Sequence, residues 1–176
     1  MLPDYKLIRI LNTNKELLIP GQLVGQFAIR ELRIGNILFM QDNDTDIYYS
    51  LVRVTAIKEE SVEFTPLVSD YQTFDLTENE ITQHIYGVLI NQELLFKLNF
   101  SEEIDSLSPD SVFFSDYDLC PGKAHIRMTK FKYYDEWSVH IDNCDCDTIG
   151  NNHNIQELHQ LQNFIIDCGY NLDELL

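Results

Sequence analysis

Residues 48–67 read YYSLVRVTAIKEESVEFTPL, and this stretch decides the fold class. Its first half, residues 48–57, is rich in β-branched and aromatic residues, while residues 61–67 alternate polar and apolar side chains. Both patterns are typical of β-strands. The polar residues between them predict a turn, so we expect an antiparallel pair.

Similar segments lie on both sides of this pair. Residues 34–40 predict a turn leading into a strand, and residues 71–76 predict a shorter fourth strand. Strands that recur every roughly 8–12 residues and are joined by polar turns are typical of a curled or closed sheet. We therefore expect residues 31–84 to form a small SH3-like antiparallel β-barrel or a meander.

The first thirty residues are expected to form an N-terminal arm added to this sheet. Residues 5–11 predict a strand, residues 12–15 a polar turn, and Pro20-Gly21 a further break in the chain.

Residues 85–176 predict a helix, a β-hairpin and a closing helix, either as a separate part or in one compact domain with the sheet. Asn91 can cap the first helix, residues 125–131 and 137–141 flank a polar turn, and Gly169 can end the last helix. The fold class is therefore α+β. The apolar positions at helical spacing are Leu94, Leu95 and Leu98 in the first helix and Ile155, Leu158, Leu161 and Ile165 in the last.

Residues 101–122 are rich in Ser, Asp, Pro and Gly and predict a long acidic loop. Structureless loops longer than about 12–15 residues are uncommon unless they are functional or disordered. This loop carries Val112-Phe113-Phe114, which predicts an aromatic anchor with an acidic rim on a protein-binding surface. The alternative is that an aromatic ring packs into the core and anchors the loop. The candidate binding residues are Phe113, Phe114, Asp110, Asp116 and Asp118.

The chain is strongly acidic, with 29 Asp and Glu against 12 Lys and Arg and a net charge of -17. Between Glu59 and Gly122 the sequence has 14 carboxylates and one base, Lys97. This composition argues against direct binding to nucleic acid or to an anionic membrane surface, which both require clustered cations. It favours a protein partner with a basic surface, although a merely solvated acidic surface is the alternative.

We expect a cytoplasmic protein with reduced thiols. The first fifteen residues lack a long apolar core and a cleavage site, and no apolar stretch approaches the length of a membrane span. The four cysteines are not spaced as a disulfide framework.

Zinc is the metal that the sequence allows, through Cys144 and Cys146 with His140 and His153 nearby. One residue between two cysteines strains joint chelation, and no second cysteine pair is present, so we expect free thiols and no cofactor. The five histidines do not lie beside a recognisable nucleophile, and no catalytic motif occurs. His159 is expected to lie at a boundary, bonded to a neighbour, and we expect no enzyme activity.

Three short motifs occur in a fixed order: RIGN at residues 33–36, LINQELLFKLNF at residues 89–100, and ELHQLQNF at residues 157–164. In this order they resemble a family of small uncharacterised proteins of Bacteroidetes and their phages. That family combines an R-x-G-N strand opening, an L-T-E-E-x-L-x-K-x-G-F helix and a V-H-x-L-Q-N-L-Y terminal helix. The present chain departs from it at Asn91-Gln92, at Asn99 and at Phe164-Ile165.

The resemblance implies a phage or mobile-element context, in which many small acidic proteins act by binding. We therefore expect an acidic accessory protein that binds another protein in the host cytosol. It would inhibit a host nucleic-acid enzyme or defence complex by charge mimicry. The alternatives are a metal-dependent hydrolase that uses the 140–153 loop, and a virion or assembly component.

Overall fold

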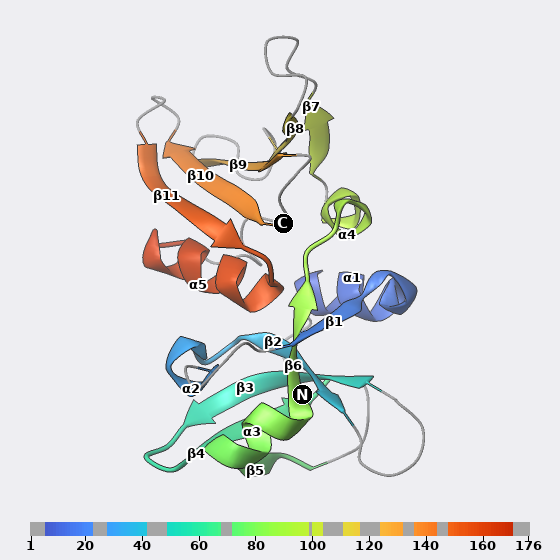
Figure 1. Cartoon of the computed structure of the whole chain (residues 1–176), viewed down its shortest axis with the longest axis vertical. Helices are drawn as coiled ribbons and strands as arrows, with labels where there is room; N and C mark the ends of the chain where they lie inside the picture. Colours follow the sequence, from blue (N-terminus) through green and yellow to red (C-terminus); the bar gives the residue numbers. More distant parts are fainter. Residues whose placement is uncertain are drawn as a thin grey trace. The chain divides into compact units, whose positions relative to one another are not determined.

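The computed structural model in Figure 1 describes nine stretches of the chain. They are residues 6–22, 28–41, 49–67, 72–98, 100–103, 111–116, 124–131, 136–143 and 148–170. Their elements are α1 (Lys6–Thr13), a 3-10 turn (Lys15–Leu17), β1 (Ile19–Gln22), α2 (Ala28–Glu31), β2 (Ile37–Gln41), β3 (Tyr49–Ile57), β4 (Ser61–Pro66), β5 (Phe74–Thr77), α3 (Glu78–His84), β6 (Ile85–Leu89), α4 (Gln92–Lys97), β7 (Ser101–Glu103), β8 (Ser111–Asp116), β9 (Ala124–Phe131), β10 (Trp137–Asn143), β11 (Thr148–Ile155) and α5 (Leu158–Asp167).

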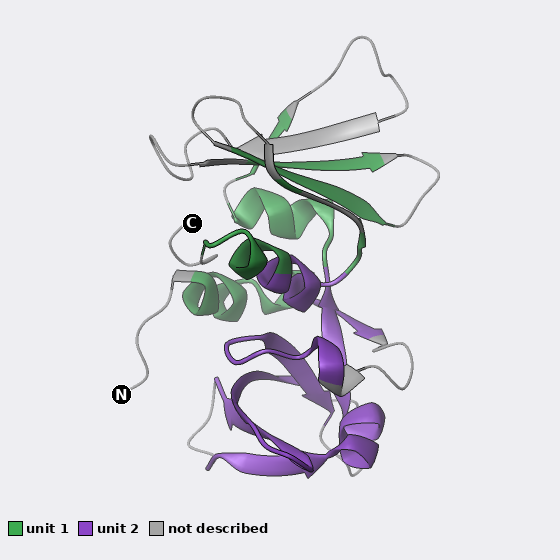
Figure 2. Cartoon of the chain, turned by 90° about the vertical axis from the view of Figure 1, so that its left-hand side faces the viewer, with its two compact units in different colours: residues 1–17, 90–156, 164–176 green, residues 18–89, 157–163 purple. Residues whose placement is uncertain are grey.

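The chain forms two compact units, coloured in Figure 2. Unit 1 comprises residues 1–17, 90–156 and 164–176, and unit 2 comprises residues 18–89 and 157–163. Sequence analysis predicts consecutive parts with boundaries at residues 30 and 84. The two compact units interleave along the chain, and residues 157–163 belong to unit 2 although they come late in the sequence.

Unit 2 contains a six-stranded antiparallel sheet with the order β1-β6-β2-β3-β4-β5. Its β2–β5 part is a meander of sequential neighbours, as the strand pattern predicts. The described strands leave this sheet open, so it does not close into a barrel. The predicted break at Pro20-Gly21 is wrong, because residues 19–22 form edge strand β1. An edge strand tolerates proline, which has no N–H to donate.

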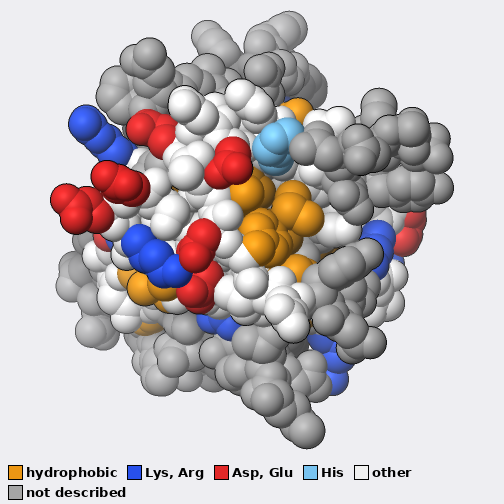
Figure 3. Space-filling view, turned by 90° about the horizontal axis from the view of Figure 1, so that it is seen from below, with side chains coloured by type: hydrophobic (Ala, Val, Ile, Leu, Met, Phe, Trp, Pro, Cys, Tyr) orange, Lys and Arg blue, Asp and Glu red, His pale blue; other side chains and the backbone are white. Residues whose placement is uncertain are grey.

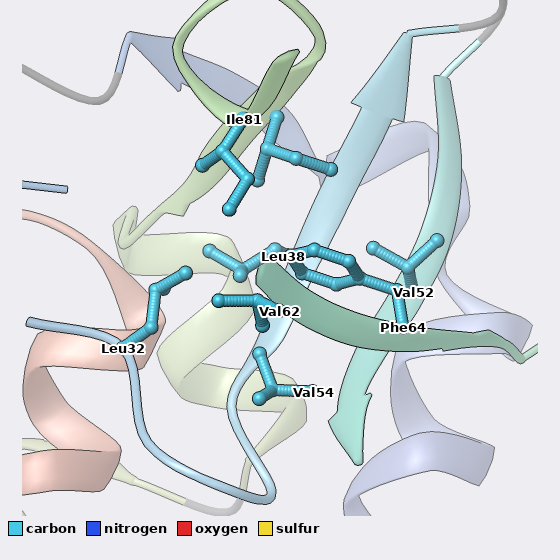
Figure 4. Close-up of a cluster of buried hydrophobic side chains, with 8 residues drawn as sticks. Leu32, Leu38, Val52, Val54, Val62, Phe64 and Ile81 are labelled. Carbon is cyan, nitrogen blue, oxygen red and sulfur yellow. The ribbon is translucent and has the colours of Figure 1, made fainter. Parts of the chain in front are cut away.

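The core of unit 2 follows from the alternation in β4. Val62, Phe64 and Pro66 are buried, whereas the residues between them are half-buried. Figure 4 shows Phe64 among apolar side chains from several elements, and its ring stacks on Phe74 with centroids 5.8 Å apart. The buried cluster consists of Leu32, Leu38, Val52, Val54, Val62, Phe64, Ile81 and Ile85.

Unit 1 contains a five-stranded antiparallel sheet with the order β11-β10-β9-β8-β7. The predicted hairpin is confirmed as β9 and β10, which pair from Ala124–Asn143 to Lys130–Trp137. Residues 101–103 and 111–116 are strands β7 and β8, so the prediction of one long loop over residues 101–122 is wrong for these segments. The apolar run Val112-Phe113-Phe114 was interpreted as an anchor within a loop, whereas it lies in β8 and pairs with β9.

Strand β11 was also not predicted, because its sequence is rich in Asn and contains a glycine. These residues are depleted in strands, yet backbone pairing with β10 overrides that preference. The pairing is irregular: its register shifts twice, and Asn154 has a positive φ of 68°.

The N-terminal strand prediction is wrong, since residues 6–13 form helix α1. Leu7 and Leu11, four residues apart, are buried on one face of this helix. A short apolar run fits either a strand or a helix when only its sequence is considered.

The two predicted helices are confirmed as α4 and α5. The Asn91 side chain accepts a hydrogen bond from the Leu94 N–H at 2.8 Å, which caps α4. Leu158, Leu161 and Ile165 are fully buried along α5. Gly169, with φ of +86°, follows the helix as expected, whereas Ile155 belongs to β11.

Candidate functional site

Gln162 and Asn163, in the middle of the closing helix, bind to the turn that precedes β2, and both segments belong to unit 2. The Ile37 N–H donates to Gln162 Oε1 at 3.0 Å, and Gln162 Nε2 donates to the Gly35 carbonyl at 3.3 Å. The amide of one side chain thus pairs with one backbone group of the RIGN turn and with one of the first residue of β2. Two of the three motifs that carry the family resemblance therefore lie in contact.

Asn36 is the centre of this turn. It is fully buried, its Oδ1 accepts from the Arg33 N–H at 2.8 Å, and its Nδ2 donates to Asn163 Oδ1 at 2.8 Å. Gly35 has a φ of +99°, in the region that favours glycine. Because a buried amide is costly without partners, these bonds explain the residue types at the end of the RIGN motif.

Glu157 lies against a pair of glycines on the sheet. Gly21 of β1 and Gly87 of β6 are cross-strand partners, and a Cβ atom on either would collide with the Glu157 carboxyl group. The Glu157 backbone forms a β-bridge with Leu89. The two missing side chains therefore provide the space in which this carboxyl is buried, with 6% of the residue exposed.

His159 lies beside Glu157 and is only 1% exposed. Its Nδ1 atom is 3.2 Å from Glu157 Oε2, and its Nε2 atom is 3.9 Å from Glu31 Oε2 on α2. Both distances are within ion-pair range, yet neither ring nitrogen makes a hydrogen bond. The expectation that His159 is a boundary residue bonded to a neighbour is therefore wrong.

The environment favours the neutral form of both groups. Burial raises the pKa of Glu157 to about 7, and the nearby Glu31 carboxylate adds to this rise. Burial also lowers the pKa of His159 to about 4. A buried ion pair without further hydrogen bonds seldom recovers its desolvation cost, so we interpret the pair as a neutral carboxyl beside a neutral imidazole.

A carboxyl that remains protonated near pH 6 has the property of a general acid. The burial of Glu157 and His159 nevertheless keeps a substrate away from both groups. The two ring nitrogens also face different carboxylates, so a single metal ion cannot join all three side chains. The arrangement contributes no accessible catalytic group.

A second feature of unit 2 lies at its surface, in residues 58–80. Among its described residues, the exposed carboxylates are Glu59, Glu60, Asp75, Glu78 and Glu80. We call residues 58–67 and 72–80 the acidic segment. Lys58 is the one base within residues 58–80, and its Nζ lies 2.7 Å from Asp75 and 3.2 Å from Glu63. The hydrogen bonds to Asp75 and Glu63 raise the pKa of Lys58. The lysine charge is therefore already neutralised within the segment.

Figure 3 views the chain from the end at which β4, β5 and α3 lie in Figure 1. Acidic side chains gather on one side of this face, and hydrophobic side chains gather near its middle. Met40, Phe74 and Leu76 pack against the buried cluster of unit 2 and are themselves half-buried. An apolar centre beside exposed charge is the composition expected of a protein-binding surface.

The predicted metal ligands are not brought together in the described part of the chain. His140 lies on β10, with Nε2 at 3.0 Å from Asp142 Oδ1. Cys144 and Cys146 lie outside the described residues, as does the side chain of His153 on β11. Among described residues, no three His, Cys, Asp or Glu side chains form a group that could hold a metal ion.

The predicted protein-binding residues fall mainly outside the described part. Phe113, Phe114 and Asp116 belong to the backbone of β8, but their side chains are not described. Asp110 and Asp118 lie wholly outside the described residues. Their role in binding stays a prediction.

Sequence reasoning missed the Glu157–His159 pair and the residues that surround it. A glycine within a strand indicates close approach of another group, and Gly87 carried that signal. Gly21 was interpreted as a turn residue instead. The partner of both glycines, Glu157, is distant in sequence, so no local pattern joins the three residues.

No protein-family model, curated protein or solved structure matches the chain. None of the helices in the described stretches is both long and apolar enough to cross a bilayer.

Proposed function

We propose that the chain is an acidic, non-enzymatic accessory protein of a phage or mobile element that binds a protein with a basic surface. The observation that carries this proposal is the acidic segment of unit 2. Five of its carboxylates are exposed, and its only lysine is paired with one of them, Asp75, and with Glu63. One lysine cannot balance these carboxylates, so the segment keeps a net negative charge that attracts a cationic partner.

The resemblance to small proteins of Bacteroidetes and their phages supports the biological context. In that context, the partner is a host nucleic-acid enzyme or defence complex, whose basic groove the acidic segment occupies in place of nucleic acid. Charge on one face accelerates the encounter with such a groove and makes binding sensitive to salt. We also propose that the open β2–β5 meander is related in shape to the SH3-like barrels that commonly serve as interaction modules.

The test is a pull-down with the tagged full chain from a Bacteroidetes host lysate. We expect a basic protein to be captured at low salt and released by high salt or by added duplex DNA, which would compete for the same groove. Recovery of no basic protein at either salt concentration would refute the proposal. Retention of the partner in excess DNA would refute charge mimicry while leaving protein binding intact.

Two matched variants locate the binding face. Glu60→Lys with Glu78→Lys reverses two exposed charges of the acidic segment, and Glu93→Lys with Glu102→Lys reverses two exposed charges in unit 1. Both variants change the net charge equally. Loss of capture with the first variant alone would assign binding to unit 2.

A further inference from the structure

Glu157 and His159 are buried titratable groups that the proposed binding function does not use. The carboxyl lies in the space above Gly21 and Gly87, and the imidazole lies 3.2 Å from it without a hydrogen bond. Unit 2 thus keeps an acid and a base side by side, away from water.

We propose that the folded chain holds one proton on the Glu157 carboxyl beside a neutral His159, and that folding transfers this proton from the imidazole to the carboxyl. No covalent bond other than the two proton bonds changes. In the unfolded chain near pH 5.5, the carboxyl is ionised and the imidazole is protonated. In the folded chain the same single proton resides on the carboxyl.

The groups that face the pair favour this location of the proton. Strands β1 and β6 present Gly21, Gly87 and Leu89, which carry no charge. From α2, the charged group is the Glu31 carboxylate, which opposes a second negative charge on Glu157. Glu31 is half exposed, so water screens its attraction for a protonated imidazole. A neutral pair therefore avoids burying a charge that the described surroundings do not compensate.

Because folding moves this proton without a net uptake or release of protons, the pair does not change how stability depends on pH. Burial raises the pKa of Glu157 from 4.5 to about 7, so its contribution to stability is full below pH 4.5 and is lost as pH rises toward 7. Burial lowers the pKa of His159 from 6.5 to about 4, so its contribution is full above pH 6.5 and is lost as pH falls toward 4. Between pH 4.5 and 6.5 the two slopes are opposite and cancel.

Removing either group by a single substitution leaves the pH dependence of stability that the other group contributes. Relative to the wild-type chain, Glu157→Gln should make the unfolding equilibrium constant fall about tenfold per pH unit between pH 4.5 and 6.5. His159→Leu should make it rise about tenfold per pH unit over the same range. The control is Asn79→Ala, at an exposed position of α3 that does not titrate, which should leave the wild-type slope unchanged.

The direct test is an NMR titration of the labelled full-length wild-type chain, which does not depend on whether a variant folds. We expect the Glu157 carboxyl carbon to titrate near pH 7, and the His159 ring to remain neutral at pH 5.5. In urea, the same ring should be protonated at that pH. A protonated His159 in the folded chain at pH 5.5, or a Glu157 titration near pH 4.5, would show an ion pair and overturn the proposal. Variants with the wild-type slope would also overturn it.

Discussion

The side-chain amides of Asn36 and Asn163, 127 positions apart in the sequence, are hydrogen-bonded at 2.8 Å. This bond joins the RIGN turn before β2 to the middle of the closing helix. The neighbouring Gln162 adds bonds to Gly35 and Ile37. The late segment 157–163 is therefore an integral part of unit 2, and its removal would leave buried polar groups of the turn without partners.

Replacing Asn36 with Ala is expected to destabilise the chain by about 2–3 kcal/mol, because the Arg33 N–H and Asn163 Oδ1 both lose their partner. Urea unfolding measures this change. The control Asn79→Ala, at an exposed position of α3, should have little effect. Equal midpoints for the two variants would show that the turn does not depend on Asn36.

The glycine pair under Glu157 gives a second prediction. Gly87→Ala should destabilise the chain by roughly 1–3 kcal/mol or more, because the new methyl group collides with the Glu157 carboxyl. In a Glu157→Ala background the same substitution should cost much less, since the colliding group is gone. Thermal unfolding of the four chains measures this coupling. Additive effects would show that the glycine does not make room for Glu157.

Lys58 provides a prediction that separates stability from binding. Its ion pairs with Glu63 and Asp75 are exposed to water, so Lys58→Ala should change the unfolding midpoint little. The substitution also removes the one positive charge of the segment, so it should tighten binding of a basic partner. Weaker binding would mean that Lys58 itself contacts the partner.

Strand β8 carries the alternative binding face that the sequence predicts, next to Glu102 on β7. If the partner binds there, Phe114→Ala with Asp116→Lys weakens binding and leaves the thermal midpoint nearly unchanged, whereas binding by the acidic segment of unit 2 leaves affinity near that of the wild type. Calorimetry and a binding titration on the same preparation check both parts. Unfolding several degrees earlier would place the aromatic side chains in the core of unit 1.

The sequence predicted the elements whose signals are local. Strands β2–β5, the β9–β10 hairpin and helices α4 and α5 carry periodic apolar residues or a capping residue, such as Asn91 before α4. Helix α1 was mistaken for a strand because Lys6–Thr13 is too short for its periodicity to decide. Strand β11 was missed because its Asn-rich sequence forms a strand only through pairing with β10.

The site was less accessible to sequence reasoning than the fold. The acidic segment is visible as composition, since residues 58–80 contain a single base. The Glu157–His159 pair depends on Gly21, Gly87 and Glu31, which tertiary structure brings together from three distant segments. A histidine next to a leucine on a helix gives no indication that both of its ring nitrogens are buried without hydrogen bonds.

The central claim is that the acidic segment of unit 2 binds a basic protein. Its most direct test is the dissociation constant of the captured partner as a function of salt, measured for the wild type and for the two double charge reversals. We predict that wild-type affinity falls steeply with salt. We also predict that Glu60→Lys with Glu78→Lys weakens binding about tenfold or more at low salt, while Glu93→Lys with Glu102→Lys binds nearly as the wild type does. A salt-independent affinity, or equal weakening by both variants, would contradict the account.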